Sequence, residues 1–235
     1  MTELSPSLAR IARVAEALGP ELAARVVFIG GAVLPLLTDR NEIFETLRLT
    51  MDVDGMVVTS TYVQKGMLEE ALRIRGFRHA TGTATHVDRW HTPHGDLLDL
   101  TSCGEHLGGT GSAHDRFAHD TAVRHELPPH IRHASPLGFL VLKWGAYRDR
   151  GQDAPHRSKD LSDLVVILLA SEQWREELEN APCWVREFVR EQATALLADW
   201  RAIGALPFQI DALGPSENGL VDRLLDRLGD VGKVG

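Results

Sequence analysis

The stretch Arg48-Leu49-Thr50-Met51-Asp52-Val53-Asp54 decides the fold, because it places two carboxylates inside an apolar run with the pattern of a β-strand. Side chains alternate between the two faces of a strand, so Asp52 and Asp54 point the same way. Two negative charges at such a short distance repel each other, so we expect a cation between the two carboxylates. Mg²⁺ prefers carboxylate and phosphate oxygens, so the stretch predicts a magnesium site. The alternative is a surface strand whose solvent face carries two Asp, although Asp is depleted in strands.

A second motif lies upstream, where the apolar run Val26–Ile29 ends in Gly30-Gly31 and an apolar helical pattern follows over Ala32–Leu37. Two glycines let the backbone approach a ligand closely, and the N–H groups that open a helix can bind phosphate. A plain tight turn would also explain the glycine pair. The two motifs in this order make a phosphate-binding site the stronger interpretation.

The composition is that of an ordinary globular protein, with 235 residues, 43% hydrophobic, 25% charged and a net charge of −8. Such an acidic chain is not expected to coat nucleic acids in general, because the affinity of proteins for nucleic acids comes mainly from neutralising phosphates. The total charge does not exclude a local basic groove. Cys103 and Cys183 have no metal-binding or redox spacing, so we expect a reduced, cytoplasmic protein. No signal peptide and no membrane span is predicted.

The strand, the Gly-Gly pair, the helix and the Asp-x-Asp strand together resemble the nucleotidyltransferase superfamily. More narrowly, the chain is similar to the AbiEii-type nucleotidyltransferases, the toxins of abortive-infection and toxin–antitoxin systems. The resemblance implies that Asp52 and Asp54 hold two Mg²⁺ ions and that Gly30 and Gly31 face the β- and γ-phosphates of an NTP. One departure is Gly31, since many members of the superfamily carry a Ser after the first glycine of this motif, and here Gly31 and then Ala32 follow Gly30.

In that superfamily a neighbouring strand supplies a third carboxylate. The segments His86–His91 and Gly95–Thr101 have the pattern of a hairpin joined by Thr92-Pro93-His94. Asp96 and Asp99 are three residues apart and face opposite sides of the second strand. Asp99 lies between two leucines, as in the family pattern, and we choose it as the third metal ligand. We expect Asp96 to be exposed.

The C-terminal half carries a third element of the resemblance: Lys143, Arg148, a polar loop, and then Lys159-Asp160-Leu161-Ser162-Asp163-Leu164. The resemblance implies that Lys143 binds the triphosphate and that Asp160 is an essential polar group, with Arg148 and Lys159 as weaker candidates. If the loop joins two antiparallel helices, Lys143 and Asp160 lie near the same end of the pair. The alternative is that Asp160 only caps its helix.

Three further patterns have simple interpretations. His79, His86, His91 and His94 lack a metal-ligand spacing and are expected on the exposed hairpin. The Gly-rich segment Gly108–Ser112 lacks the Lys of a phosphate loop and is expected to be a connector. In the helices we expect Met67 on an inner face and Trp184 and Trp200 in the core.

The fold prediction is therefore α/β or α+β, with a small mixed sheet in residues 1–112 and a helical domain in residues 113–235 that completes the NTP cleft. The predicted reaction moves a nucleoside monophosphate from an NTP to an acceptor hydroxyl and releases pyrophosphate. Three hypotheses on the function remain. In the first, the protein is a toxin restrained by an antitoxin protein, and the acceptor is RNA, such as a tRNA 3′ end. In the second, the acceptor is an aminoglycoside-like small molecule or a protein, and in the third the chain is a non-catalytic nucleotide-binding module.

Overall fold

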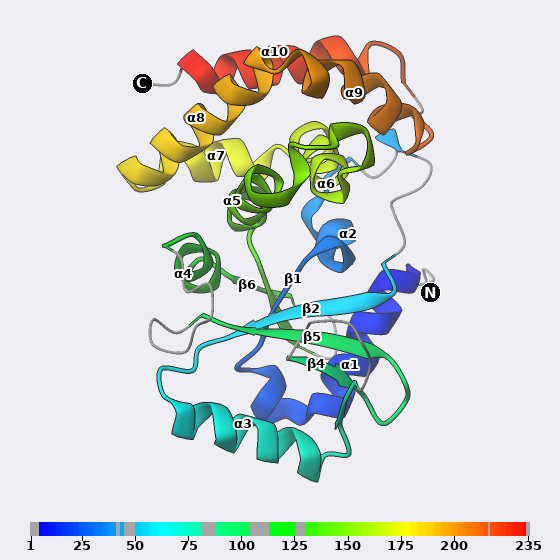
Figure 1. Cartoon of the computed structure of the whole chain (residues 1–235), viewed down its shortest axis with the longest axis vertical. Coiled ribbons are helices and arrows are strands. Elements are labelled where there is room, and N and C mark those ends of the chain that lie inside the picture. The colour runs from blue at the N-terminus through cyan, green and yellow to red at the C-terminus, as the bar shows by residue number, and fades with distance from the viewer. Residues whose placement is uncertain are drawn as a thin grey trace. The chain divides into compact units, whose positions relative to one another are not determined.

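The computed structural model describes residues 5–40, 43–44, 50–80, 88–103, 113–125, 130–215 and 217–233. The chain forms two compact units (Figure 1). The sheet unit comprises Met1–Pro35 and Leu49–Ser135, and the helical unit comprises Leu36–Arg48 and Pro136–Gly235. The predicted fold class is confirmed, since a mixed sheet with flanking helices is followed by a helical C-terminal part.

The described strands of the sheet unit form one mixed sheet in the order β3-β4-β5-β2-β1-β7-β6. The strands are β1 (Val27–Ile29), β2 (Asp52–Val57), β3 (Arg78–His79), β4 (Arg89–His91), β5 (Leu97–Ser102), β6 (Val123–His125) and β7 (Ile131–His133). The pairs β2–β5 and β1–β7 are parallel, and the other neighbours are antiparallel. The strand with Asp52 and Asp54 is thus central in the sheet, beside β5 (Figure 1).

The first helix, α1 (Pro6–Ala23), begins at Pro6, because the side chain of Ser5 accepts a hydrogen bond from the backbone N–H of Leu8 at 3.3 Å and caps the helix. The pair Gly19-Pro20 interrupts this helix. Gly19 adopts a positive φ of 69° and kinks the helix, which continues to Ala23. The helix packs against β2 and β7.

Helix α3 (Tyr62–Ile74) is capped by Thr61, whose hydroxyl accepts a hydrogen bond from the Gln64 N–H at 3.2 Å. Leu68 and Leu72 are buried on it. The prediction that Met67 lies on the inner face of α3 is wrong, because Met67 is 68% exposed. Neighbouring apolar positions of α3 are exposed as well: Tyr62, Val63 and Ile74.

The two units divide at Pro35–Leu36, Arg48–Leu49 and Ser135–Pro136, whereas the sequence predicted one boundary between residues 112 and 113. Helix α4 (Ala113–Asp120) and strands β6 and β7 belong to the sheet unit. The reason is strand pairing, since β7 extends the sheet on the far side of β1 and β6 pairs with β7.

The helical unit has α6 (Lys159–Ala170) as its buried centre, and all its residues from Asp160 to Ala170 are buried. The other helices are α5 (Pro136–Ala146), α7 (Gln173–Glu179), α8 (Cys183–Ala198), α9 (Trp200–Asp211) and α10 (Leu220–Lys233). Helices α5, α9 and α10 pack against α6. Two shorter turns connect α5 to α6: the π-helical turn η3 (Tyr147–Gly151) and the 3₁₀ turn η4 (Pro155–Arg157).

Two aromatic positions of this unit differ from expectation. Trp200 is 81% exposed and Trp184 is 38% exposed, so neither belongs to the core. Both lie in the first turn of their helices, α9 and α8. In the part of the chain that the structure describes, no helix has the length and apolar character needed to cross a membrane.

Candidate active site

The three predicted carboxylates lie on two adjacent parallel strands. Asp52 and Asp54 belong to β2, Asp99 belongs to β5, and Asp54 pairs directly with Asp99 in the sheet register. Paired residues of neighbouring strands project from the same face, so all three side chains project from one face of the sheet. Each of the three residues is partly exposed. The structure thus brings together the three predicted metal ligands, while their role as ligands stays a prediction.

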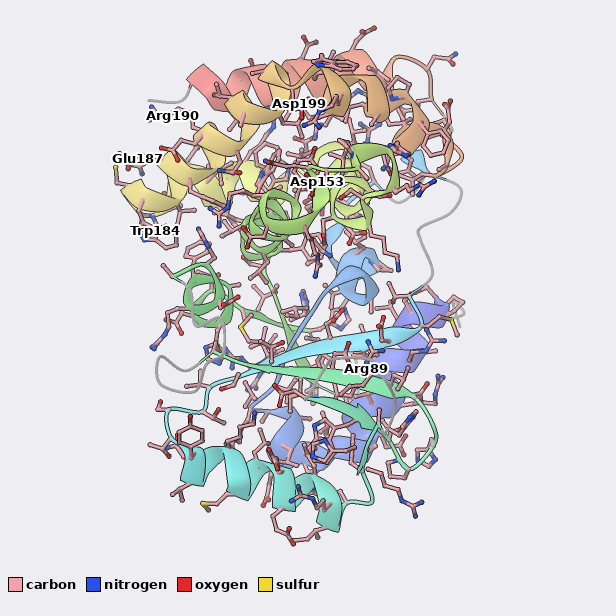
Figure 2. All side chains as sticks on the ribbon, in the orientation of Figure 1. Arg89, Asp153, Trp184, Glu187, Arg190 and Asp199 are labelled. Carbon is pink, nitrogen blue, oxygen red and sulfur yellow. The ribbon has the colours of Figure 1, made fainter. Side chains whose placement is uncertain are left out.

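A cation does lie among these carboxylates, and it is the guanidinium group of Arg89 (Figure 2). Arg89 is opposite Asp99 in the β4–β5 register. Its Nε donates to Asp99 Oδ1 at 2.6 Å, and its Nη2 donates to Asp99 Oδ2 at 2.5 Å and to Asp52 Oδ2 at 3.0 Å. The hydrogen bonds to Asp99 outweigh the desolvation of Arg89, and its pKa is raised. The expected positive charge is therefore supplied by the chain itself.

Sequence reasoning missed Arg89, although a signal was available. The hairpin around Thr92-Pro93-His94 pairs Trp90 with Leu98, and the same register pairs residue 89 with residue 99. Trp90 is buried, so its neighbour Arg89 projects to the opposite face, which is the face of the carboxylates. Counting back from the turn would have placed the arginine opposite Asp99.

Gly30 is in direct contact with the carboxylate of Asp54. Strand β1 pairs Ile29 with Asp54, and Gly30 follows with a positive φ of 72°. A Cβ atom built at Gly30 would lie 2.0 Å from Oδ2 of Asp54, a distance that no side chain tolerates. Only glycine fits here, for both its backbone angle and the absence of a side chain.

The helix expected after Gly30 is short. Gly31 opens the three-residue 3₁₀ turn η1 (Gly31–Val33), which is followed by the four-residue α2 (Leu34–Leu37). Such short segments provide little helix dipole, because partial charges grow with the number of aligned peptide units. The expectation that a helix start binds phosphate is therefore not supported, and only the close approach of the glycine backbone remains.

Asp96 has a different environment from Asp99. Its side chain is 10% exposed and pairs with Arg13 Nη2 at 2.7 Å and with Arg10 Nε at 3.5 Å. The hydrogen bond from Arg13 lowers the pKa of Asp96 despite partial desolvation. The predicted exposure of Asp96 is thus wrong, since the residue ties the start of β5 to helix α1.

In the helical unit, Lys143 of α5 forms a buried cluster with two carboxylates of α6. Its Nζ lies 3.1 Å from Asp160 Oδ1 and 2.6 Å from Asp163 Oδ2. Burial alone would lower the pKa of Lys143, but Asp163 and Asp160 outweigh it and the pKa is raised. The predicted proximity of Lys143 and Asp160 is therefore confirmed, and Asp163 is the partner that sequence reasoning did not assign.

Asp160 has a second basic partner in Arg150 of the π-helical turn η3, whose Nε donates to Asp160 Oδ2 at 2.8 Å. Burial would raise the pKa of Asp160, but the hydrogen bond from Arg150 and the charge of Lys143 lower it below its ordinary value of 3.8. Of the two weaker nucleotide-binding candidates, Arg148 bonds to Asp149 at 3.0 Å and Lys159 is exposed. Arg150, which sequence reasoning did not name as a candidate, is the residue of this turn that contacts Asp160.

The chemistry of the three carboxylates suits a hard cation such as Mg²⁺. In the present arrangement no group of three His, Cys, Asp or Glu side chains from the described ranges is positioned to hold a metal, and Arg89 engages two of the carboxylates. Metal binding would therefore replace the contacts of Arg89. Among the expected histidines, His79 stacks on Trp90 with a centroid distance of 3.7 Å. His86 and Gly108–Ser112 lie outside the described residues.

No family model matches the chain, and no curated protein matches it significantly.

Proposed function

We propose that the chain is a metal-dependent nucleotidyltransferase that moves a nucleoside monophosphate from an NTP to an acceptor hydroxyl and releases pyrophosphate. The observation that carries the proposal is the pairing of Asp54 with Asp99 on parallel strands, beside Asp52 and in contact with Gly30. Phosphoryl transfer depends on charge neutralisation and in-line placement more than on covalent catalysis. A face with three carboxylates and a glycine backbone meets that need once Mg²⁺ is bound.

In this proposal Asp52 and Asp54 would hold two Mg²⁺ ions, which would supply charge neutralisation for the transferred phosphoryl group. Asp99 would be the third ligand and would accept the proton of the acceptor hydroxyl. Gly30 and Gly31 leave room for the β- and γ-phosphates. As the family resemblance implies, Lys143 is assigned to the triphosphate, and Asp160 is assigned as an essential polar group. Since Lys143 already has two carboxylate partners, its role requires a change of partners on NTP binding.

The acceptor in this proposal is RNA, as the family resemblance implies for a toxin with an antitoxin partner. The competing acceptors are a cationic small molecule and a protein hydroxyl, and the net charge of −8 favours a cationic acceptor. Incubation of the pure protein with each labelled NTP, Mg²⁺ and either total RNA, an aminoglycoside or cell protein distinguishes them. Label transfer that requires Mg²⁺ is expected in one of the three reactions.

Asp54→Asn tests the chemistry most directly. The amide keeps the shape beside Gly30 but removes one metal-binding charge, so transfer is expected to fall by at least about 10³-fold while the folded state persists. Glu70→Gln is a matched control, because Glu70 is an exposed carboxylate of α3 in the same unit. Near-normal transfer by Asp54→Asn would reject the assignment.

A second candidate function is nucleotide binding without catalysis. It is favoured by the contacts of Arg89 with Asp52 and Asp99, which neutralise the site without a metal. This hypothesis predicts Mg²⁺-independent NTP binding and no label transfer to any acceptor. Equilibrium dialysis with labelled NTP, with Mg²⁺ or with EDTA, separates the two functions.

A further inference from the structure

A pocket of about 260 Å³ lies in the helical unit, where the 3₁₀ turn η4 leads into α6 and α9 packs against both. The described residues that line it include three basic and two polar ones: His156, Arg157, Lys159, Ser162 and Gln209. The members of the Lys143 cluster are not among these lining residues. The pocket is therefore distinct from the buried ions, although both lie at the start of α6.

The pocket carries positive charge that the described part of the chain does not balance. His156, Arg157 and Lys159 are all exposed, and none of them has an ion-pair partner among the described residues. The described lining of the pocket also contains no Asp or Glu. Such a concentration of basic side chains, in a chain with a net charge of −8, favours an anionic ligand.

The start of α6 adds backbone hydrogen-bond donors. The Ser158 hydroxyl accepts from the Leu161 N–H at 3.1 Å, which leaves the N–H groups of Lys159 and Asp160 without an acceptor among the described residues. Free N–H groups at the positive end of a helix, here one of 12 residues, bind anions. The carboxylate of Asp160 does not oppose such an ion, because its two basic partners neutralise it.

Two buried side chains of the pocket have hydrogen-bonding capacity that the described chain does not use. Ser162 is 8% exposed, and its hydroxyl makes no hydrogen bond with any described residue. Gln209 is 5% exposed, and its amide nitrogen donates to the carbonyl oxygens of Pro155 at 2.8 Å and Ser158 at 3.4 Å. These bonds fix the orientation of the amide and leave its oxygen without a donor in the described ranges. Neither oxygen is among the unpaired polar atoms that are fully enclosed, so both are open to a ligand in the pocket.

We propose that this pocket binds a phosphate group with an O–H donor, as found in hydrogen phosphate and in the phosphate esters of polyols. The charged oxygens would accept from the N–H groups of Lys159 and Asp160 and from the Ser162 hydroxyl. The side chains of Arg157 and Lys159 would balance the charge. The O–H group would donate to the amide oxygen of Gln209. The site does not depend on the proposed nucleotidyltransferase activity.

The probes are inorganic phosphate and ribose 5-phosphate, and sulfate is the matched control, because it is a tetrahedral anion without an O–H donor at neutral pH. Binding is measured by titration calorimetry on the full chain, in chloride buffers of constant ionic strength. We expect phosphate or ribose 5-phosphate to bind at least about tenfold more tightly than sulfate, since sulfate leaves the Gln209 oxygen unpaired. Tighter binding of ribose 5-phosphate identifies an organic phosphate as the source, and tighter binding of inorganic phosphate identifies the free ion.

Two variants test the residues of the pocket. Lys159→Gln removes one charge and Ser162→Ala removes the unpaired hydroxyl, and each should weaken phosphate binding about three- to tenfold. The melting temperature of the free protein should change little, because neither group has a side-chain partner in the described chain. Arg190→Gln is the matched control, because it removes a positive charge of α8 outside the pocket (Figure 2). The proposal is overturned if no probe binds, if sulfate binds as tightly as phosphate, or if either variant binds phosphate as tightly as the wild type.

Discussion

Arg89 has a central electrostatic role at the candidate site, because it reaches two carboxylates of the same sheet face. Asp52, Asp54 and Asp99 would repel one another without a cation, and Arg89 supplies one from β4. Removal of Asp52 relieves repulsion among the carboxylates. It also removes an attraction, because Asp52 contacts Arg89 at 3.0 Å.

We predict that Arg89→Met lowers the free energy of unfolding by about 2 kcal/mol in the absence of metal, because Asp99 loses a bidentate partner. Binding of Mn²⁺, measured by electron paramagnetic resonance, should strengthen because the competing cation is gone. The control is Arg78→Met on the exposed strand β3 of the same sheet. Unchanged metal affinity in Arg89→Met would mean that the arginine does not compete with a metal.

Gly30 provides a second prediction. Gly30→Ala combines a positive φ of 72° with a clash against Asp54, and we expect a loss of about 1–3 kcal/mol in chemical denaturation. Gly95→Ala is the matched control, since Gly95 has a φ of 86° but nothing within 4 Å of the added Cβ. It should lose only about 1 kcal/mol. Equal losses in the two variants would show that the contact with Asp54 is not constraining.

Helices α5 and α6 are joined by the buried ions Lys143, Asp160 and Asp163. Asp160 is 4% exposed as a residue, and Arg150 adds a further charge from the π-helical turn. Buried ions of this kind are costly to separate, since the remaining partner is left uncompensated in a dry environment. The contact of Arg150 with Asp160 therefore attaches the segment between α5 and α6 to the two helices.

We predict that Asp160→Asn destabilises the helical unit by about 3 kcal/mol at pH 7, as followed by urea denaturation. The folded pKa of Asp160 is below its ordinary value of 3.8, so its stabilisation is complete above that value and is lost as pH falls through the folded pKa. The difference between wild type and variant should thus shrink only below about pH 4.

The control for this prediction is Asp149→Asn, which breaks the exposed pair with Arg148 and should change stability by about 0–1 kcal/mol at every pH. A difference between wild type and Asp160→Asn that stays constant down to pH 2 would contradict the assigned titration.

One of the divisions between the two units lies at Ser135–Pro136, after β7, and this position has consequences for folding. β1 lies between β2 and β7 in the sheet, so a chain that ends before β7 leaves one edge of β1 unpaired. Exposed strand edges of this kind promote association with other chains. The helical unit also includes Leu36–Arg48, where the N–H of Asp39 donates to the Ala170 carbonyl at 2.8 Å.

We therefore predict that a fragment of residues 1–135 is monomeric and has a cooperative melting transition, whereas a fragment of residues 1–112 aggregates. Size-exclusion chromatography and circular dichroism measure the two properties. The fragments differ only by the segment with α4, β6 and β7. Equal behaviour of both fragments would mean that β7 is dispensable for the sheet.

Local sequence patterns were sufficient to predict several individual helices and strands. The caps Ser5 and Thr61, the hairpin around Pro93, and the common face of Asp52 and Asp54 follow from side-chain chemistry and from the two-residue period of a strand. Such features depend on neighbours within a few residues, so one sequence suffices to predict them. The pattern of a helix does not reveal which of two apolar faces is covered, which is why Met67 and Trp200 were assigned to the core.

The contacts within the candidate site and the order of the strands were decided by pairing between distant parts of the chain. The contact of Gly30 with Asp54 depends on the β1–β2 register, and the place of β7 in the sheet depends on its pairing with β1. Arg150 reaches Asp160 because a π-helical turn shifts the residues after α5, and nothing in the local sequence marks that turn. These partners are distant along the chain, and they meet only because the sheet and the helix pair form as units with many simultaneous contacts.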